Sequence, residues 1–415
     1  ETARMETITI NAERPAYGGI TIGRSGGKVV MITGAIPGET VEARIDLEKK
    51  DYSTATVLRV LEPSPDRVVP GCPYFGSCGG CHLQHIEYAR QVSLKQEVLA
   101  DCIRRMAGLE PDFQPPLNGP PWGYRRRAQF KVSRGKAGLY RGKTRDVIDM
   151  DSCPVMAPEV NAMLVKARGL VRGLDVRELH ISCGNGPVAL VKTGEGPKSA
   201  WDRLAGSMLA LGFAGVFVET GRKRVLKYGR GFTTFELGGL SYTVSPMSFF
   251  QGNWGVNHEL VRAVIEGLGP PDGKTVLDLY SGAGNFSLPI ALKAGKVTAV
   301  EENPYAVEDG RRNAGLSGIK NCTFVRSGVD SLKSSGAVDV LIIDPPRTGL
   351  ANKAADIILS AAPSRIVYVS CNPASFARDL KKLSELYDVE SVRLVDFFPQ
   401  TYHIESVAFL RPRIR

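Results

Sequence analysis

The chain has 415 residues, which is too long for a single hydrophobic core and indicates two or three domains. Its longest apolar runs are far shorter than a membrane span, and its first residues lack the charged-then-apolar layout of a secretory signal. We therefore expect a soluble, cytoplasmic, monomeric protein without a membrane partner. The net charge of +10 lies almost wholly in the middle of the chain: −1 in residues 1–68, +10 in 69–245 and +1 in 246–415. A basic surface confined to one part of a chain is typical of proteins that bind a polyanion.

Residues 1–68 have the pattern of a small all-β unit. Short alternating runs are separated by Gly-Gly, Pro-Gly and charged turns, and they lie at residues 7–10, 29–32, 40–45 and 53–58. This spacing fits a barrel of the oligonucleotide-binding type. The segments Gly18–Arg24 and Ile36–Glu39 resemble the TRAM domain found on RNA-modifying enzymes. A barrel that only supports folding is the alternative, because this part of the chain has no positive excess.

A glycine-rich segment at 71–85 carries three cysteines, Cys72, Cys78 and Cys81, with the spacing Cys-x5-Cys-x2-Cys. Eight cysteines in all are too few per residue for a disulfide-stapled secreted fold. Thiolates are the ligands that soft metals and iron–sulfur centres require. Cys153 is the best fourth ligand because it lies in a polar, turn-like context, whereas Cys102 lies inside a helical pattern. The spacing fits either an iron–sulfur cluster or a zinc ion bound by four cysteines.

Residues 122–145 contain nine Lys or Arg and no acidic residue, interleaved with four aromatic residues. Lys and Arg side chains bind RNA phosphates, and aromatic rings stack on unpaired bases. This combination therefore favours contact with single-stranded RNA. A solvated charged face is the alternative. We expect RNA contacts from Arg125, Arg126, Arg127, Phe130, Lys131 and Arg134. The neighbouring strand-like and helix-like segments predict an α/β central domain over 69–245, with a helix at about 88–110 that packs on the next domain.

Residues 246–415 follow a regular βαβ pattern. A strand from Thr275 ends in a glycine turn containing Gly282 and Gly284, and a helix follows it. The next strand ends in Glu301, which suits a ribose diol, and a later strand ends in Asp344. A glycine turn alone also occurs in dinucleotide enzymes. Together these features indicate a Rossmann-like domain of an S-adenosylmethionine-dependent methyltransferase.

Cys371 follows a run of β-branched and aromatic residues, 366–369, that stops at a polar Ser-Cys-Asn-Pro turn. The thiol is therefore expected where a strand ends, which is the edge of an α/β sheet at which ligands bind. The alternative is a buried cysteine that acts as a small hydrophobic residue. The polar neighbours of Cys371 are not typical of a core.

Several of these motifs together resemble the RNA uracil-5-methyltransferase family. They are Phe249–Gln251, the glycine turn at 282–284, Asp344–Arg347, Ser370–Pro373 and Phe398–Glu405. The resemblance covers nearly the whole chain and includes the iron–sulfur branch of the family. One cofactor contact of the family is an asparagine where this chain has about Ser327–Gly328.

The resemblance implies a fold and a set of site residues. The fold is a multidomain α/β chain: a TRAM-like barrel, a central iron–sulfur and RNA-binding domain, and a Rossmann-like catalytic domain. It implies a 4Fe-4S cluster at Cys72, Cys78, Cys81 and Cys153. It implies that Cys371 is the nucleophile and Glu405 the catalytic base. The implied cofactor and target-base residues are Gln251, Tyr280, Gly282, Gly284, Asn285, Glu301 and Asp344.

The chemistry explains why these residue types are needed. Carbon 5 of uracil is too weak a nucleophile to take a methyl group from a sulfonium, so a thiolate first adds to carbon 6. A carboxylate must later remove the carbon-5 proton. We expect 5-methyluridine formation in structured RNA, with ribosomal RNA of the large subunit favoured over transfer RNA. The alternatives are RNA cytosine-5 methylation and an iron–sulfur RNA-binding or assembly factor without activity.

Overall fold

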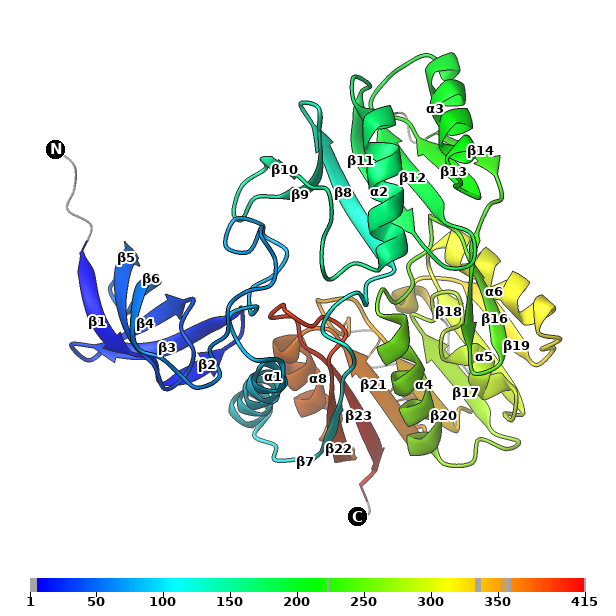
Figure 1. The fold of residues 1–415 in the computed structure, drawn as a ribbon. Helices are drawn as coiled ribbons and strands as arrows, with labels where there is room; N and C mark the ends of the chain where they lie inside the picture. The colour runs from blue at the N-terminus through cyan, green and yellow to red at the C-terminus, as the bar shows by residue number, and fades with distance from the viewer. Residues whose placement is uncertain are drawn as a thin grey trace.

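The computed structural model describes residues 6–413 apart from 222–223, 333–336, 352–353, 355–357 and 359. Figure 1 shows an N-terminal β unit in blue, a central α/β unit in cyan and green, and a C-terminal unit in yellow to red. None of the helices in these described ranges is long and apolar enough to cross a membrane.

The N-terminal unit is one six-stranded sheet with its own hydrophobic core around Ile10, Ile32 and Val41. All neighbouring strands are antiparallel except the pair β4 and β6. The strand order is β1 (Thr7–Asn11), β5 (Thr40–Glu48), β6 (Tyr52–Glu62), β4 (Lys28–Thr33), β3 (Ile20–Ser25) and β2 (Arg14–Ala16).

The central unit is a seven-stranded sheet packed against two helices, α2 (Pro158–Val171) and α3 (Lys198–Ala210). The strands pair antiparallel except β12 and β13, whose parallel pairing is connected through α3. The order is β10 (Val147–Asp149), β9 (Lys136–Tyr140), β8 (Arg127–Ser133), β11 (Val176–Ser182), β12 (Val188–Thr193), β13 (Gly215–Glu219) and β14 (Val225–Gly229).

The C-terminal unit is built on an eight-stranded sheet. Its parallel half runs β19 (Cys322–Arg326), β18 (Lys296–Glu301), β17 (Thr275–Leu279), β20 (Val340–Ile343) and β21 (Arg365–Ser370). The other half runs β23 (Glu405–Pro412), β22 (Tyr387–Val395) and β7 (Asp112–Leu117), and β23 is antiparallel to β21. The helices include α4 (Trp254–Leu268), α5 (Ser287–Ala291), α6 (Pro304–Leu316) and α8 (Pro373–Leu383), with a 3₁₀ turn at Val329–Ser331. The strand order reverses between β17 and β20, where open α/β sheets bind their ligands.

Two segments from residues 69–245 pack on the C-terminal unit, and one of them contains the helix expected at about 88–110 to pack there. Helix α1 (Tyr88–Cys102) and the π-helical turn Ile103–Ala107 share a core with α8 and β22, and β7 extends the sheet beside β22. The hairpin of β15 (Thr233–Leu237) and β16 (Leu240–Val244) packs into the same unit, next to α6. The pairing of β7 joins residues almost 280 positions apart, which periodicity along the chain does not indicate.

Candidate active site

The sheet topology brings four strand ends to one edge. The glycine turn follows β17, Glu301 ends β18, Asp344 follows β20 and Cys371 follows β21. Because β23 is antiparallel to β21, its first residue, Glu405, lies at the same edge. A cavity of about 570 Å³ opens there.

Most of the predicted catalytic and cofactor residues line this cavity. They are Gln251, Tyr280, Gly282, Glu301, Asp344, Cys371 and Glu405. Asn285 lines an adjoining cavity of about 60 Å³, and its side chain exchanges hydrogen bonds of 2.8 and 3.0 Å with Asn257. Gly284 lies behind the turn with φ +94°, and a Cβ there would be 2.8 Å from Leu288 and 2.9 Å from Phe324. Gly284 therefore lets the turn pack closely on the core.

The turn after β17 is tied to the end of β18. The carboxylate of Glu301 accepts hydrogen bonds from the backbone N–H groups of Gly282, at 3.0 Å, and Asn303, at 2.7 Å. Tyr280, which has a side chain, adopts φ +63°, a left-handed conformation that is costly for such a residue. These hydrogen bonds fix Glu301 at the cavity wall.

Two carboxyl groups that line the cavity are buried, and each keeps its proton to a higher pH than an exposed carboxyl group does. Burial, and then Asp344, raises the pKa of Glu405 to about 8. Burial, and then Glu301, raises the pKa of Asp344 to about 7. The Oε2 atom of Glu405 is buried and has no hydrogen-bond partner among the described residues. A cationic ligand such as a sulfonium would favour the ionised form of both groups.

Cys371 is held in a turn that the next helix fixes. The side chain of Asn372 caps α8 by accepting hydrogen bonds from the N–H groups of Ala374, at 2.9 Å, and Ser375, at 3.4 Å. Burial, and then the nearby Glu405, raises the pKa of the Cys371 thiol to about 11, while Arg347 acts in the opposite direction. Without a ligand, the sulfur is therefore mainly a thiol at neutral pH.

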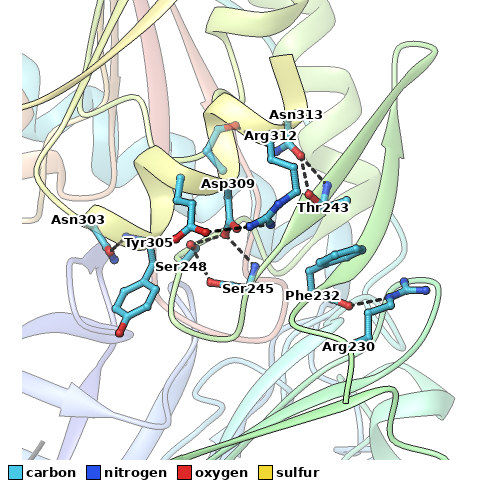
Figure 2. Close-up of polar contacts among 12 residues, drawn as sticks. Arg230, Phe232, Thr243, Ser245, Ser248, Asn303, Tyr305, Asp309, Arg312 and Asn313 are labelled. Carbon is cyan, nitrogen blue, oxygen red and sulfur yellow. Dashed lines mark hydrogen bonds and ion pairs between the residues drawn. The ribbon is translucent and has the colours of Figure 1, made fainter. Parts of the chain in front are cut away.

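The loop that carries Phe249 and Gln251 is anchored to α6 by a buried network (Figure 2). Asp309 accepts hydrogen bonds from the N–H of Ser245, at 2.8 Å, and the hydroxyl of Ser248, at 2.5 Å. Arg312 donates to the second oxygen of Asp309 at 2.9 Å. This anchor holds the loop in place, although Phe249 itself is 65% exposed at the cavity.

Some cavity residues were not assigned a role from the sequence. Arg347 and Phe398 line the cavity, and both lie inside motifs that the sequence analysis had recognised. Ser327 and Gly328 line it as well, at the position where the family has an asparagine. In the sequence, only the position of these four residues within or beside the recognised motifs indicated that they line the site; their residue types did not.

Comparison with known proteins agrees with this geometry. A family model described as tRNA (Uracil-5-)-methyltransferase matches residues 330–413, one described as TRM5/TYW2 methyltransferase domain matches 254–351, and one described as TRAM domain matches 2–58. The 23S rRNA (uracil(1939)-C(5))-methyltransferase RlmD of Alkalilimnicola ehrlichii is 36% identical, and the match covers 92% of this chain and 91% of that protein. The chain belongs to the RNA uracil-5-methyltransferase family. The enzyme of the same name from Klebsiella pneumoniae is 34% identical, with 100% and 97% covered.

A solved structure also resembles this member of the RNA uracil-5-methyltransferase family. It is Pyrococcus abyssi tRNA (uracil-54, C5)-methyltransferase in complex with S-adenosyl-L-homocysteine. The TM-score is 0.78 at 26% identity, and the match covers 97% of this chain and 100% of that one. The expected methyltransferase fold and TRAM domain are thus confirmed.

The four cysteines of the predicted cluster lie in the same region of this methyltransferase, near enough to affect one another's pKa. All are free; Cys72 and Cys153 are buried, and Cys78 and Cys81 are half-buried. Burial is the main cause that raises the pKa of Cys81 to about 12 and that of Cys153 to about 11, and the other cysteines of the group raise both further. The N–H of Gly80 donates to Sγ of Cys78 at 3.4 Å. Within the described ranges, no three His, Cys, Asp or Glu side chains lie close enough to hold a metal ion.

The predicted RNA-binding residues differ in how far their side chains are exposed, and the burial of Phe130 contradicts a stacking role for that ring. Phe130 on β8 is fully buried in the central core, because side chains alternate along this strand between the core and the other face. The guanidinium of Arg127 is buried; it donates to the carbonyl of Ser248 at 2.8 Å and lies over the rings of Phe249 and Phe250. Lys131 pairs with Glu178 at 2.5 Å. Arg125 and Arg126 are half-buried, and Arg134 is exposed in the β8–β9 turn.

Proposed function

We propose that this chain transfers a methyl group from S-adenosylmethionine to carbon 5 of a uracil in large-subunit ribosomal RNA. The observation that carries the proposal is the single cavity that Glu301, Cys371 and Glu405 share at the switch point of the sheet. The relatives that match the chain over almost its full length are named for a uracil of 23S ribosomal RNA.

Each step has a residue suited to it. The Cys371 thiolate forms a bond to carbon 6, and the electron pair moves to the carbon-4 oxygen as an enolate. Carbon 5 of the enolate attacks the methyl group, and the bond from methyl to the sulfonium breaks to leave S-adenosylhomocysteine. Glu405 removes the carbon-5 proton, the bond from carbon 6 to sulfur breaks, and the thiolate is regenerated.

The remaining residues hold the two substrates. We assign Glu301 to accept hydrogen bonds from the ribose hydroxyls of the cofactor. Two backbone N–H groups already hold its carboxylate in position. Gly282 and Tyr280 line both cavities, Asn285 lines the smaller one, and Gly284 lets the turn pack on the core behind them. Gln251 and Asp344 also line both cavities, and we assign them to contacts with the cofactor and the target base.

The reaction is tested by methylation of transcribed ribosomal RNA fragments. Tritium should be released from RNA labelled at carbon 5 of uracil and not from RNA labelled at carbon 5 of cytosine; the reverse result would identify a cytosine methyltransferase. Cys371→Ala should abolish release. The half-buried Cys322 outside the cavity provides the matched control, Cys322→Ala, which should retain activity. Full activity in Cys371→Ala would overturn the mechanism.

Transfer RNA is the second candidate substrate, because the solved Pyrococcus abyssi structure carries tRNA in its name and matches the whole chain. Equal amounts of ribosomal and transfer RNA from cells lacking the protein would be offered together. Mass spectrometry of the methylated positions then decides between them. We also propose that the enzyme acts as a cytoplasmic monomer, which gel filtration with light scattering would test.

The cysteine group is proposed to hold a 4Fe-4S cluster on Cys72, Cys78, Cys81 and Cys153. Two features support this: the other three thiols all raise the pKa of Cys81, and the N–H of Gly80 donates to Sγ of Cys78. The cluster would provide a cross-link between the loop at 72–81 and Cys153. An anaerobic preparation should absorb broadly near ~400 nm and contain iron. About one zinc per chain without that absorbance would replace the cluster with a tetrahedral zinc ion.

RNA contact by the central unit is proposed at the residues whose side chains reach the surface, namely Arg134 with the partly exposed Arg125 and Arg126. Arg125 also donates to the carbonyl of Arg127 at 2.9 Å, so its position is fixed. Phosphate contacts of this kind give binding that falls with salt.

A further inference from the structure

The turn between β2 and β3 of the N-terminal unit lies at a junction of three units. This turn, Tyr17–Gly19, connects two neighbouring strands of the TRAM sheet. Gly19 has φ +71°, and a Cβ there would be 3.3 Å from Cβ of His82 and 3.3 Å from Cβ of Tyr402. Figure 1 shows the blue unit beside α1, with β2 on that side. The turn therefore packs against both the cysteine segment, at His82, and the segment before Glu405, at Tyr402.

Aromatic rings from these three units form a connected row. The ring of Tyr17 meets that of Tyr402 edge to face at 5.5 Å between centroids. Tyr402 is also 4.5 Å from His82 and 4.5 Å from His403, and His403 is 5.6 Å from Phe398. Phe398 lines the catalytic cavity. The row therefore leads from the TRAM unit to the cavity wall.

Tyr17 also lies beside the segment that leads to Glu405. Burial and Tyr402 raise the pKa of its phenol, and the charges of Arg347 and Cys371 act on it as well. Tyr17, Tyr402 and Ile404 line one small cavity of about 30 Å³, and Ile404 directly precedes Glu405. The Tyr17 side chain is only half-buried. Part of the ring is therefore exposed where the TRAM unit meets the segment that precedes Glu405.

We propose that Tyr17 stacks on an unpaired RNA base next to the uracil that enters the cavity, so that the TRAM unit contributes directly to the substrate site. The inference rests on the proposed function, because it assumes an RNA substrate. A uracil must leave its stack to reach Cys371, and its neighbours then lose a stacking partner. An aromatic side chain offers a replacement face, whatever the base, and this is how unpaired RNA is commonly held.

The test uses the full-length protein and an RNA fragment that the wild-type protein methylates, drawn from ribosomal or transfer RNA. Single 2-aminopurine substitutions are placed at the nucleotides on either side of the target uridine, since stacking quenches this base. Wild-type protein and Tyr17→Phe should quench one of these positions. Tyr17→Leu, which keeps an apolar side chain but has no ring, should leave it bright and raise the KM for RNA roughly ten-fold. The KM for S-adenosylmethionine should stay within about two-fold, because the cofactor cavity is intact.

Tyr52, on β6 of the same TRAM unit and partly exposed, provides the matched control. The Tyr52→Leu variant should quench 2-aminopurine fluorescence and bind the RNA as the wild-type protein does. Quenching by Tyr17→Leu equal to that of wild type would overturn the stacking role. If Tyr17→Leu folds poorly, ultraviolet cross-linking of wild-type protein to RNA with 5-iodouridine beside the target decides: the cross-linked peptide should contain Tyr17, and cross-links elsewhere only would overturn the proposal. Failure of the wild-type protein to methylate any RNA would instead overturn the proposed function and this inference together.

Discussion

Ser370 on β21 and Ser406 on β23 are paired partners in antiparallel strands. Cys371 directly follows Ser370 at the end of β21, and Glu405 directly precedes Ser406, so one sheet register brings the proposed nucleophile and the proposed base to the same edge. The two roles are 34 positions apart in the sequence. The rigid ladder, rather than a flexible loop, sets their spacing, and this allows one cavity to hold both.

The role of Glu405 gives a specific prediction. Glu405→Gln should form the bond between Cys371 and carbon 6 and transfer the methyl group, but it should not release the product, because an amide does not accept the carbon-5 proton. Turnover should fall about 10²–10⁴-fold, and a covalent RNA adduct should appear on a denaturing gel. Glu385→Gln, on an exposed turn, is the control and should form no lasting adduct. Normal turnover in Glu405→Gln would assign the base elsewhere.

Cofactor affinity should depend on pH through the buried carboxyl groups. The pKa values of Asp344 and Glu405 are raised to about 7 and about 8. A sulfonium favours their ionised forms, so S-adenosylmethionine should bind more tightly as pH rises from 6 to 8, with release of protons below pH 8. S-adenosylhomocysteine has no sulfonium and should show a weaker pH dependence. Calorimetry in buffers of different ionisation enthalpy measures the protons, and identical profiles for both ligands would contradict the electrostatic argument.

The same burial should affect stability in the absence of ligand. Because the folded pKa of Glu405 lies above its unfolded value, the folded state is favoured while the group is protonated, and this contribution is lost as pH rises toward 8. Glu405→Gln does not titrate. The wild-type protein should therefore lose stability relative to Glu405→Gln between pH 5 and 9, by on the order of 1–3 kcal/mol. Chemical denaturation at several pH values measures the difference, and a constant difference would show that Glu405 is not desolvated.

Helix α1 should be coupled to the catalytic edge through a buried ion pair. Lys95 is 3% and Asp396 1% exposed; Nζ of Lys95 lies 2.8 Å from Asp396 and also donates to the carbonyl of Phe398 at 3.0 Å. Lys95→Ala leaves a buried charge unpaired and should cost about 3–5 kcal/mol of folding free energy. Lys198→Ala, which breaks the exposed pair with Asp202, should cost less than ~1 kcal/mol. Similar losses in urea denaturation of the two variants would contradict the difference in burial.

From the sequence, the residues at the cavity edge of the sheet were easier to predict than the long-range contacts that hold the sheet and helix α1 together. Cys371, Glu301 and Asp344 were recognisable because each follows an apolar strand pattern, and parallel strands end at one edge. The place of β7 beside β22 and the contact of Lys95 with Asp396 depend on chain segments hundreds of positions apart, and no local period encodes them. Phe130 was misassigned because charge composition was considered over 122–145 without the two-residue alternation of β8.

That correction leads to the last prediction, which separates two arginines of the same basic segment. The buried guanidinium of Arg127 holds the loop of Phe249 and Gln251 through the carbonyl of Ser248, whereas Arg134 is exposed. Arg127→Lys keeps the charge but loses the planar contact with the rings, so it should lower kcat about 5- to 10-fold with little change in the salt dependence of RNA binding. Arg134→Ala should instead weaken RNA binding and reduce the salt slope by about 1, with kcat at saturating RNA unchanged. Filter binding at several salt concentrations, together with steady-state kinetics, measures both effects. The reverse assignment, a reduced salt slope for Arg127→Lys, would place Arg127 on the RNA after all.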